Sequence, residues 1–257
     1  MIKFFRHIRK SLIQKNQMGK YFKYAIGEIV LVVIGILIAL QVNDWNEQRK
    51  ERVAERKILN EILIDLEFAQ NDLVRDIQIN KNNLKASEDL KLLLFNREKG
   101  DSLVQFMNRA YFATQFYPRT TGYQSLKSKG LDLIQSDSLR KAIINLFDLT
   151  FQIAIREGRE YEKMDNSESD LDNYLRQHLV IDKDNSLALS YYDGKFQHTT
   201  NAAKIRDFEA LFNDQRFLSM LNKSIIGRVS KIALYIDTKE KSESVAKAIK
   251  ETLGRQP

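Results

Sequence analysis

The sequence is poor in residues that interrupt helices and has none that crosslink chains: its 257 residues include 10 glycines, 2 prolines and no cysteine. The absence of cysteine excludes disulfide frameworks, thiolate nucleophiles and the lipid-modified cysteine of a lipoprotein. Because proline and glycine are the strongest interruptions of regular structure, their scarcity favours long helices without a flexible linker.

Motifs for chemistry are also missing. The chain contains no G-x-S-x-G, H-E-x-x-H, P-loop or G-x-G-x-x-G sequence. Charged residues make up 29% of the chain, and carboxylates on such charged helices are usually solvated. We therefore predict a protein that is not an enzyme and has no catalytic, cofactor-binding or metal-binding residues.

A long apolar stretch runs from Ala25 to Val42, and its centre, Ile29–Leu40, has no polar side chain. As a helix it would be about 27 Å long, close to the ~30 Å hydrocarbon core of a bilayer. Lys23 precedes it and Trp45 follows it, as at membrane interfaces. A buried core helix would be shorter, and a cleaved signal peptide would end in an A-x-A site, which is missing here. Residues 25–45 are therefore predicted to be the only transmembrane helix, an uncleaved signal anchor.

The charge distribution predicts the orientation. Basic residues beside a transmembrane segment stay in the cytoplasm, and in an amphipathic helix they suit anionic lipid headgroups. Residues 1–24 are thus predicted to be a basic cytoplasmic segment in contact with the lipid bilayer, and residues 46–257 to lie outside the cytoplasm. The later residues are neutral overall, so we expect no nucleic-acid binding despite an isoelectric point near 9.3. The first 24 residues carry the whole net charge of +7 and no acidic residue; their seven basic residues are Lys3, Arg6, Arg9, Lys10, Lys15, Lys20 and Lys23.

Two features of the apolar stretch have alternative interpretations. Gly35 and Ala39 form a small-xxx-small pair, which lets two helices approach closely, so a homodimer is one option. Glu28 either reaches the interface as part of a plain anchor or serves a partner subunit.

Three stretches of the chain resemble a known family. They are Phe4–Leu12 (FFRHIRKSL), Tyr24–Lys50 (YAIGEIVLVVIGILIALQVNDWNEQRK) and Tyr123–Phe147 (YQSLKSKGLDLIQSDSLRKAIINLF). They are similar to recurring stretches of an uncharacterised bacterial family of single-pass membrane proteins, typical of Bacteroidota. The resemblance implies an anchor in the bacterial inner membrane with a helical periplasmic domain. It supplies no activity and no site residues.

Beyond the anchor, apolar residues recur every three or four positions, which predicts helices. The expected fold class is mainly α: an N-terminal transmembrane helix followed by an elongated helical-bundle extracytoplasmic domain with one small β-hairpin. A first helix is expected over Asn46–Ile79, with Asn80–Asn83 as a bend or break before Leu84–Phe95. Later helices are expected at Leu103–Phe116 and, after a cap at Thr120 or Thr121, through Lys129 with an end at a left-handed Gly130. Further helices are expected along Leu139–Leu179 after a cap at Ser136 or Ser138, and at Ile205–Phe212. The last helix is expected from a cap at Asn213 or Asp214 to Gly254, with a solvated or frayed joint at Asp237–Ser244.

The Tyr123–Gly130 stretch has two interpretations. Its polar side chains could line a ligand pocket, or its apolar ones could pack a helical corner that Gly130 allows to turn. Apolar residues at helical spacing usually form core, which favours the corner. The pocket set is Tyr123, Ser125, Lys127 and Ser128, and the corner set is Tyr123, Leu126, Leu131 and Ile134.

The stretch Ser186–Thr200 changes from helical to alternating period, and Asp193-Gly194 is a turn dipeptide, which predicts a β-hairpin. The same region weakly resembles a calcium loop in its spacing, but the sixth position is Leu187 where the loop needs glycine. We therefore expect no metal there. Its ligand positions would be Asp182, Asp184, Ser186 and Asp193. His178 and His198 have no metal-ligand spacing and are expected to be surface or packing residues.

With no chemistry indicated, the leading interpretation is a membrane-anchored extracytoplasmic module that binds or positions another envelope protein. The alternative is a sensory domain that binds a ligand between helices. Only 24 residues would lie in the cytoplasm, so a sensor would signal through a separate subunit. An exposed apolar patch would favour the first interpretation, and a polar pocket between helices would favour the second.

Overall fold

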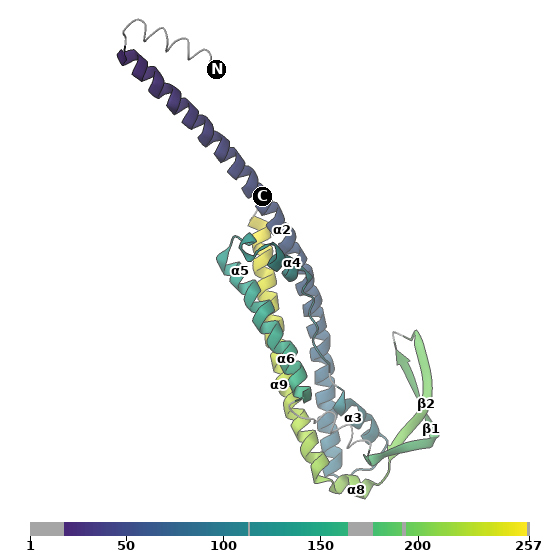
Figure 1. Cartoon of the computed structure of the whole chain (residues 1–257). Coiled ribbons are helices and arrows are strands. Elements are labelled where there is room, and N and C mark those ends of the chain that lie inside the picture. Colours follow the sequence, from purple (N-terminus) through teal and green to yellow (C-terminus); the bar gives the residue numbers. More distant parts are fainter. Residues whose placement is uncertain (1–17, 113, 164–176, 192–193, 256–257) are drawn as a thin grey trace. The chain divides into compact units, whose positions relative to one another are not determined.

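The computed structural model describes residues 18–112, 114–163, 177–191 and 194–255. It divides into two compact units, residues 1–57 and 58–257, with helices throughout and one antiparallel hairpin (Figure 1). The predicted mainly-α class with a single hairpin is confirmed.

The first described helix, α2, runs from Met18 to Phe95 and belongs to both units. Its N-terminal part contains an apolar window with a mean hydropathy of 2.3 and no buried residue. In the part of the chain that the structure describes, α2 is the one helix long and apolar enough to cross a membrane. The predicted break at Asn80–Asn83 is wrong, because the amides of Asn80 and Asn83 are buried and hydrogen-bonded within the bundle; Asn80 Nδ2 donates to Asp76 O at 2.8 Å and Asn83 Nδ2 to Phe112 O at 2.9 Å.

The frame of unit 58–257 is the antiparallel pair formed by α2 and α9 (Gln215–Arg255). Three contacts show the direction. Gln70 bonds Ser242, Asn80 bonds Arg228 and Lys91 bonds Asn222. The helix α9 has 41 residues and no interruption, so the predicted joint at Asp237–Ser244 is wrong.

The reason for this continuity is the burial of Thr238 and Ser242, which are fully inaccessible. Thr238 Oγ1 donates to Leu234 O at 2.8 Å, and Ser242 Oγ accepts from Gln70 Nε2 at 3.1 Å. Short hydroxyl side chains that bond to a helix carbonyl or across an interface can lie in a helical core.

Shorter elements cover the α2–α9 pair. The predicted helix Leu103–Phe116 ends at Tyr111, because residue 112 is extended and the carbonyls of Ala110 and Phe112 accept bonds from α9. The predicted helical stripe Leu139–Leu179 is helical as far as Lys163. Residues 164–176 lie outside the described residues. At Leu179 the prediction is wrong, because a strand begins there. The covering elements are α3 (Ser102–Tyr111), α4 (Thr121–Lys129), the 3₁₀ turn η1 (Leu131–Leu133), α5 (Asp137–Ile144), the π-helical turn η2 (Asn145–Thr150), α6 (Phe151–Lys163) and α8 (Phe208–Asn213).

Two apolar clusters form the core. The larger, the α5/α6 core, joins the middle of α2 to α4, α5, η2, α6 and the C-terminal half of α9. The smaller, the α3/α8 core, joins the end of α2 to α3, α8 and the start of α9. The capping residues agree with the sequence, since Ser136 caps α5 and Asp214 accepts from Phe217 N at 2.9 Å at the start of α9.

The hairpin consists of β1 (Leu179–Tyr191) and β2 (Phe196–Ile205), paired antiparallel. It begins earlier than the predicted Ser186–Thr200, and its register shifts between Asp182 and Ser186. Gly194 in the turn has a φ of 83°, as the turn dipeptide requires.

Candidate functional site

The pocket residues predicted in the Tyr123–Gly130 stretch are engaged with their own bundle. The buried Tyr123 ring stacks on Phe147 with centroids 4.6 Å apart, and its hydroxyl donates to Asp148 Oδ2 at 2.6 Å. Burial and this bond raise the pKa of Tyr123 far above its usual range. Lys127 Nζ lies 3.5 Å from the same carboxylate. These contacts make the stretch a packing element.

The helical corner is the arrangement that the structure shows. Leu126 and Ile134 are fully buried, and Leu131 packs partly buried against the same core. Gly130 has a φ of 106° and a ψ of 131°. The predicted positive φ is therefore confirmed, whereas the predicted left-handed helical conformation is wrong, because ψ is extended.

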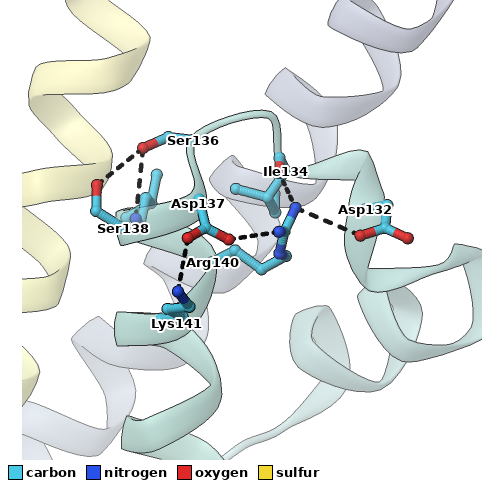
Figure 2. A network of polar contacts seen from close by, with 8 residues as sticks. Asp132, Ile134, Ser136, Asp137, Ser138, Arg140 and Lys141 are labelled. Carbon is cyan, nitrogen blue, oxygen red and sulfur yellow. Dashed lines mark hydrogen bonds and ion pairs between the residues drawn. The ribbon is translucent and has the colours of Figure 1, made fainter.

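Polar contacts hold the turn between α4 and α5 (Figure 2). Arg140 lies at its centre, where Nη1 donates to Ile134 O at 3.2 Å and Nη2 to Asp137 Oδ1 at 2.6 Å. Ser136 Oγ accepts from Leu139 N at 3.4 Å as the N-cap. The polar groups of this corner bind one another, through side chains and the Ile134 carbonyl, so we assign the network a bracing role.

The helix α4 receives its N-terminal cap from a different helix. Thr120 makes no side-chain cap bond, and Asp65 Oδ2 of α2 instead accepts from Gly122 N at 2.6 Å. Burial raises the pKa of Asp65, while the N–H groups of Gly122 and Tyr123 and the charge of Arg119 act in the opposite direction. A carboxylate at this position satisfies free N–H groups and interacts favourably with the helix dipole.

This capping depends on close contact at Gly122. A Cβ atom there would lie 2.6 Å from Ile62 N and 2.7 Å from the carbonyl carbon of Glu61. Both are backbone atoms of α2, which cannot move as a side chain would. Glycine therefore sets how closely α4 approaches α2.

A buried polar layer separates the two apolar cores. Along α2 it runs from Asp76 to Asn83, beside Ile77, the last buried residue that α2 gives to the α5/α6 core, and along α9 it lies between Leu221 and Ile232. We define the polar layer by six residues: Asp76, Asn80, Asn83, Thr114, Arg228 and Lys231.

Cations of α9 bind the chain segment that follows α3. The Arg228 guanidinium donates to Ala110 O at 2.8 Å, to Phe112 O at 3.0 Å and to Asn80 Oδ1 at 3.2 Å. Lys231 Nζ donates to Thr114 O at 3.1 Å. The layer therefore ties an extended, non-helical segment to both long helices.

Asp76 is the acidic member of the polar layer and is 1% exposed. Burial, with a smaller effect from Asp72, raises the pKa of Asp76 to about 6, and Arg75, Thr114 and Lys231 oppose this rise. Its Oδ2 atom has no hydrogen-bond partner among the described residues. The carboxyl group therefore changes charge close to neutral pH.

Sequence reasoning missed the polar layer, although a signal existed. Asp76, Asn80, Asn83 and Ser87 continue the three- and four-residue spacing of the apolar stripe along α2. Polar residues at core positions were interpreted as a helix break rather than as buried polar groups.

The carboxylate of the hypothetical calcium loop has other partners. Asp182 accepts from Asn185 Nδ2 at 2.8 Å, from Asp184 N at 3.1 Å and from Lys204 Nζ at 3.2 Å. These bonds, led by that of Asn185, lower the pKa of Asp182. They lie at the register shift of β1 between Asp182 and Ser186. Asp193 lies outside the described residues.

Beyond this irregularity the two faces of the hairpin differ in chemistry. Leu187 pairs with Thr200 and Leu189 with His198, and Phe196 lies two residues from His198 on the same face. We call this the apolar hairpin face. The opposite face carries Ser186, Ala188 and Ser190, paired with Asn201, Thr199 and Gln197.

The apolar hairpin face is accessible. Leu187 is 44% exposed and Phe196 is 55% exposed, and every residue of the distal hairpin from 183 to 188 and from 196 to 201 is exposed. An isolated two-stranded hairpin is marginally stable in water. A further surface packed on this face would bury its apolar side chains.

The histidines and Glu28 occupy separate places. His178 Nε2 lies 2.8 Å from Asp214 Oδ2, and its ring packs on Phe217, so it is a packing residue. Burial would raise the pKa of Asp214, but the Phe217 N–H and His178 more than offset this effect and lower it. His198 is exposed on the hairpin, and Glu28 lies partly exposed in α2.

Comparison with known proteins settles the family. A model described as a family of unknown function (DUF6090) matches residues 28–193, more than half of the chain. The chain belongs to this family. The DUF6090 match includes Tyr123–Phe147 and ends in the hairpin turn, while Phe4–Leu12 lies outside it. None of the curated proteins and none of the solved structures matches the chain. The bacterial, Bacteroidota-type origin stays a prediction.

Proposed function

We propose that this protein is a single-pass membrane anchor whose helical domain, outside the cytoplasm, binds and positions another envelope protein. The observation that carries the proposal is the apolar hairpin face. It combines accessible apolar side chains with strand edges that have no described neighbour, and extended partner segments commonly add to such edges.

The membrane part of the proposal is supported by charge and length. The apolar window of α2 has no buried residue, and all the excess positive charge precedes it. These features favour a cytoplasmic N-terminus in a bacterial inner membrane and a periplasmic domain.

A fusion tests the topology. A phosphatase that is active only in the periplasm, joined after Pro257, should be active in cells. The proposed orientation would be wrong if the phosphatase fusion were inactive and a reporter that works only in the cytoplasm were active at the same site.

Site-specific crosslinking tests the binding surface. A photoreactive amino acid at Leu187 or Phe196 should give a crosslink to a distinct envelope protein in intact cells. The matched controls are Ala188 and Thr199, which lie on the opposite hairpin face at neighbouring positions. Equal crosslinking from both faces, or none from Leu187 and Phe196, would contradict the proposal.

A second candidate function is sensing, and one observation favours it. A groove between α2 and α3 borders the buried polar layer and carries charged side chains, which fits a ligand-binding helical bundle.

A further inference from the structure

The groove between α2 and α3 has a volume of about 580 Å³, within the usual range for small-molecule sites, roughly 300–1,000 Å³. Its apolar lining includes Phe106 and Phe112 from α3 and the residue after it. An aromatic or aliphatic ligand body would find ring surfaces there. We call this space the α2–α3 groove.

Three charged side chains line the α2–α3 groove: Lys85 and Asp89 from α2, and Arg109 from α3. None of them makes an ion pair or hydrogen bond with the described residues, in contrast to Arg97 and Arg140, which bind carboxylates. The groove therefore presents both signs of charge to a ligand, with one more cation than anion.

One wall of the groove is held in place by buried bonds. Asn83 is 7% exposed and lines the groove. Its Nδ2 donates to Phe112 O at 2.9 Å, and the same carbonyl accepts from Arg228 Nη1 at 3.0 Å. Asn83 Oδ1 accepts no hydrogen bond from the described residues, so it is available as an acceptor at the groove wall.

We propose that the α2–α3 groove binds a free aromatic α-amino acid. The guanidinium of Arg109 matches the fork geometry of a carboxylate, with Lys85 as a second cation. Asp89 and Asn83 Oδ1 supply acceptors for an ammonium group. The ligand ring packs against Phe106 and Phe112. A zwitterion with an aromatic side chain is the small ligand class that uses both charges and the apolar lining together.

Calorimetry on the full-length protein in nanodiscs tests the ligand class. L-Phenylalanine is the probe, and 3-phenylpropionate and phenethylamine, which each lack one charged group, are the comparators. L-Phenylalanine should bind at least about tenfold more tightly than either comparator, because each lost charge-assisted contact costs about that factor. No binding of L-phenylalanine at millimolar concentration, or equal binding of all three compounds, would overturn the proposal.

Substitutions locate the site. Arg109→Gln should weaken L-phenylalanine binding about tenfold and leave phenethylamine binding unchanged. Asp89→Asn should also weaken L-phenylalanine binding about tenfold, and it should leave 3-phenylpropionate binding unchanged. Lys129→Gln, an exposed change on α4, is the matched control and should bind like the wild type. If Arg109→Gln and Asp89→Asn both bind L-phenylalanine normally, the ligand does not occupy this groove. The result is independent of the hairpin, so the failure of one proposal leaves the other intact.

Discussion

Gly122 is the position at which one added carbon atom has the clearest consequence. Gly122→Ala would place a Cβ atom 2.6 Å from Ile62 N, and relief requires α4 to move away from Asp65. Overpacking of this kind costs about 1–3 kcal/mol. We expect a lower melting temperature by circular dichroism of the full chain.

The control for this substitution is another glycine with space around it. An alanine Cβ at Gly100 would meet only Ser102 Oγ at 3.7 Å, an ordinary contact distance. Gly100→Ala should melt like the wild type. Equal melting of Gly122→Ala and wild type would mean that α4 does not lie this close to α2.

Asp76 makes stability depend on pH in a defined direction. The folded chain holds a proton on Asp76 up to a pKa of about 6, whereas the ordinary pKa is 3.8. The folded state therefore binds more protons between these values, and stability falls as the pH rises from about 4 to about 6 and stays lower above it. Asp76→Asn should remove this loss and stabilise the fold at pH 7.5 by on the order of 1–2 kcal/mol.

Urea denaturation at pH 4.5 and pH 7.5 measures this effect. The gain of Asp76→Asn should be clearly larger at the higher pH. Glu88→Gln, an exposed change on the same helix, should shift neither value. A destabilised Asp76→Asn protein at pH 7.5 would show that the charged carboxylate is needed by the nearby cations Arg75 and Lys231.

The roles of individual buried carboxylates could not be predicted from the sequence. Asp65 and Asp76 look like any other carboxylates of a charged helix, because their surroundings depend on distant partners, α4 for Asp65 and Thr114 for Asp76. The same limit applies to Gly122, since its role comes from Ile62, which is 60 residues away in the chain.

At the scale of elements, local signals predicted the ends of helices better than their interiors. Ser136, Asp214 and the positive φ of Gly130 were all indicated by turn and cap chemistry. The two predicted interruptions, Asn80–Asn83 and Asp237–Ser244, failed for one reason. Each prediction treats polar residues as weak points of a helix, whereas Asn80 and Ser242 are hydrogen-bonded to the opposite long helix or to Thr114.

The hairpin is expected to be dispensable for the bundle. Replacing residues 186–200 with an Asn-Gly turn removes the exposed distal part and keeps the pairs from Leu179 to Asp182 with β2. Because none of the described side chains in the removed stretch packs against either core, the melting temperature should change by less than about 2 °C, as for surface changes worth under about 0.5 kcal/mol.

The same variant, treated in cells with a general chemical crosslinker, should no longer co-purify with the envelope protein that photocrosslinks from Leu187 or Phe196 in the full-length hairpin. The control keeps the full hairpin length and exchanges Ser190 for threonine on the polar face. Unfolding of the shortened protein would show instead that the hairpin supports the helices.

At the scale of the whole molecule, the helical domain should fold without the membrane. Every buried apolar residue of the two cores lies at or after Ile58, and the apolar window of α2 contributes none of them. We expect residues 46–254, expressed alone and treated with chelator, to give a strongly helical spectrum and one cooperative thermal transition.

Detergent and calcium titrations provide the check on this expectation. Neither should raise the helicity of the fragment, because its stripes bury against one another and Asp182 already bonds to neighbouring groups. A disordered spectrum that becomes helical only with detergent would mean that the domain needs the bilayer to fold.

The π-helical turn η2 determines where this chain tolerates a change in its length. A π-turn contains one residue more than an α-turn. Leu149 is the residue to delete, because its side chain is 56% exposed. Its deletion would convert η2 into a regular α-helix. The buried faces of α5 and α6 would stay in phase. The same single-residue deletion in the middle of α9 would rotate every later side chain by about 100°, out of the core. Natural length variation among relatives should therefore accumulate at η2 and be absent from α9.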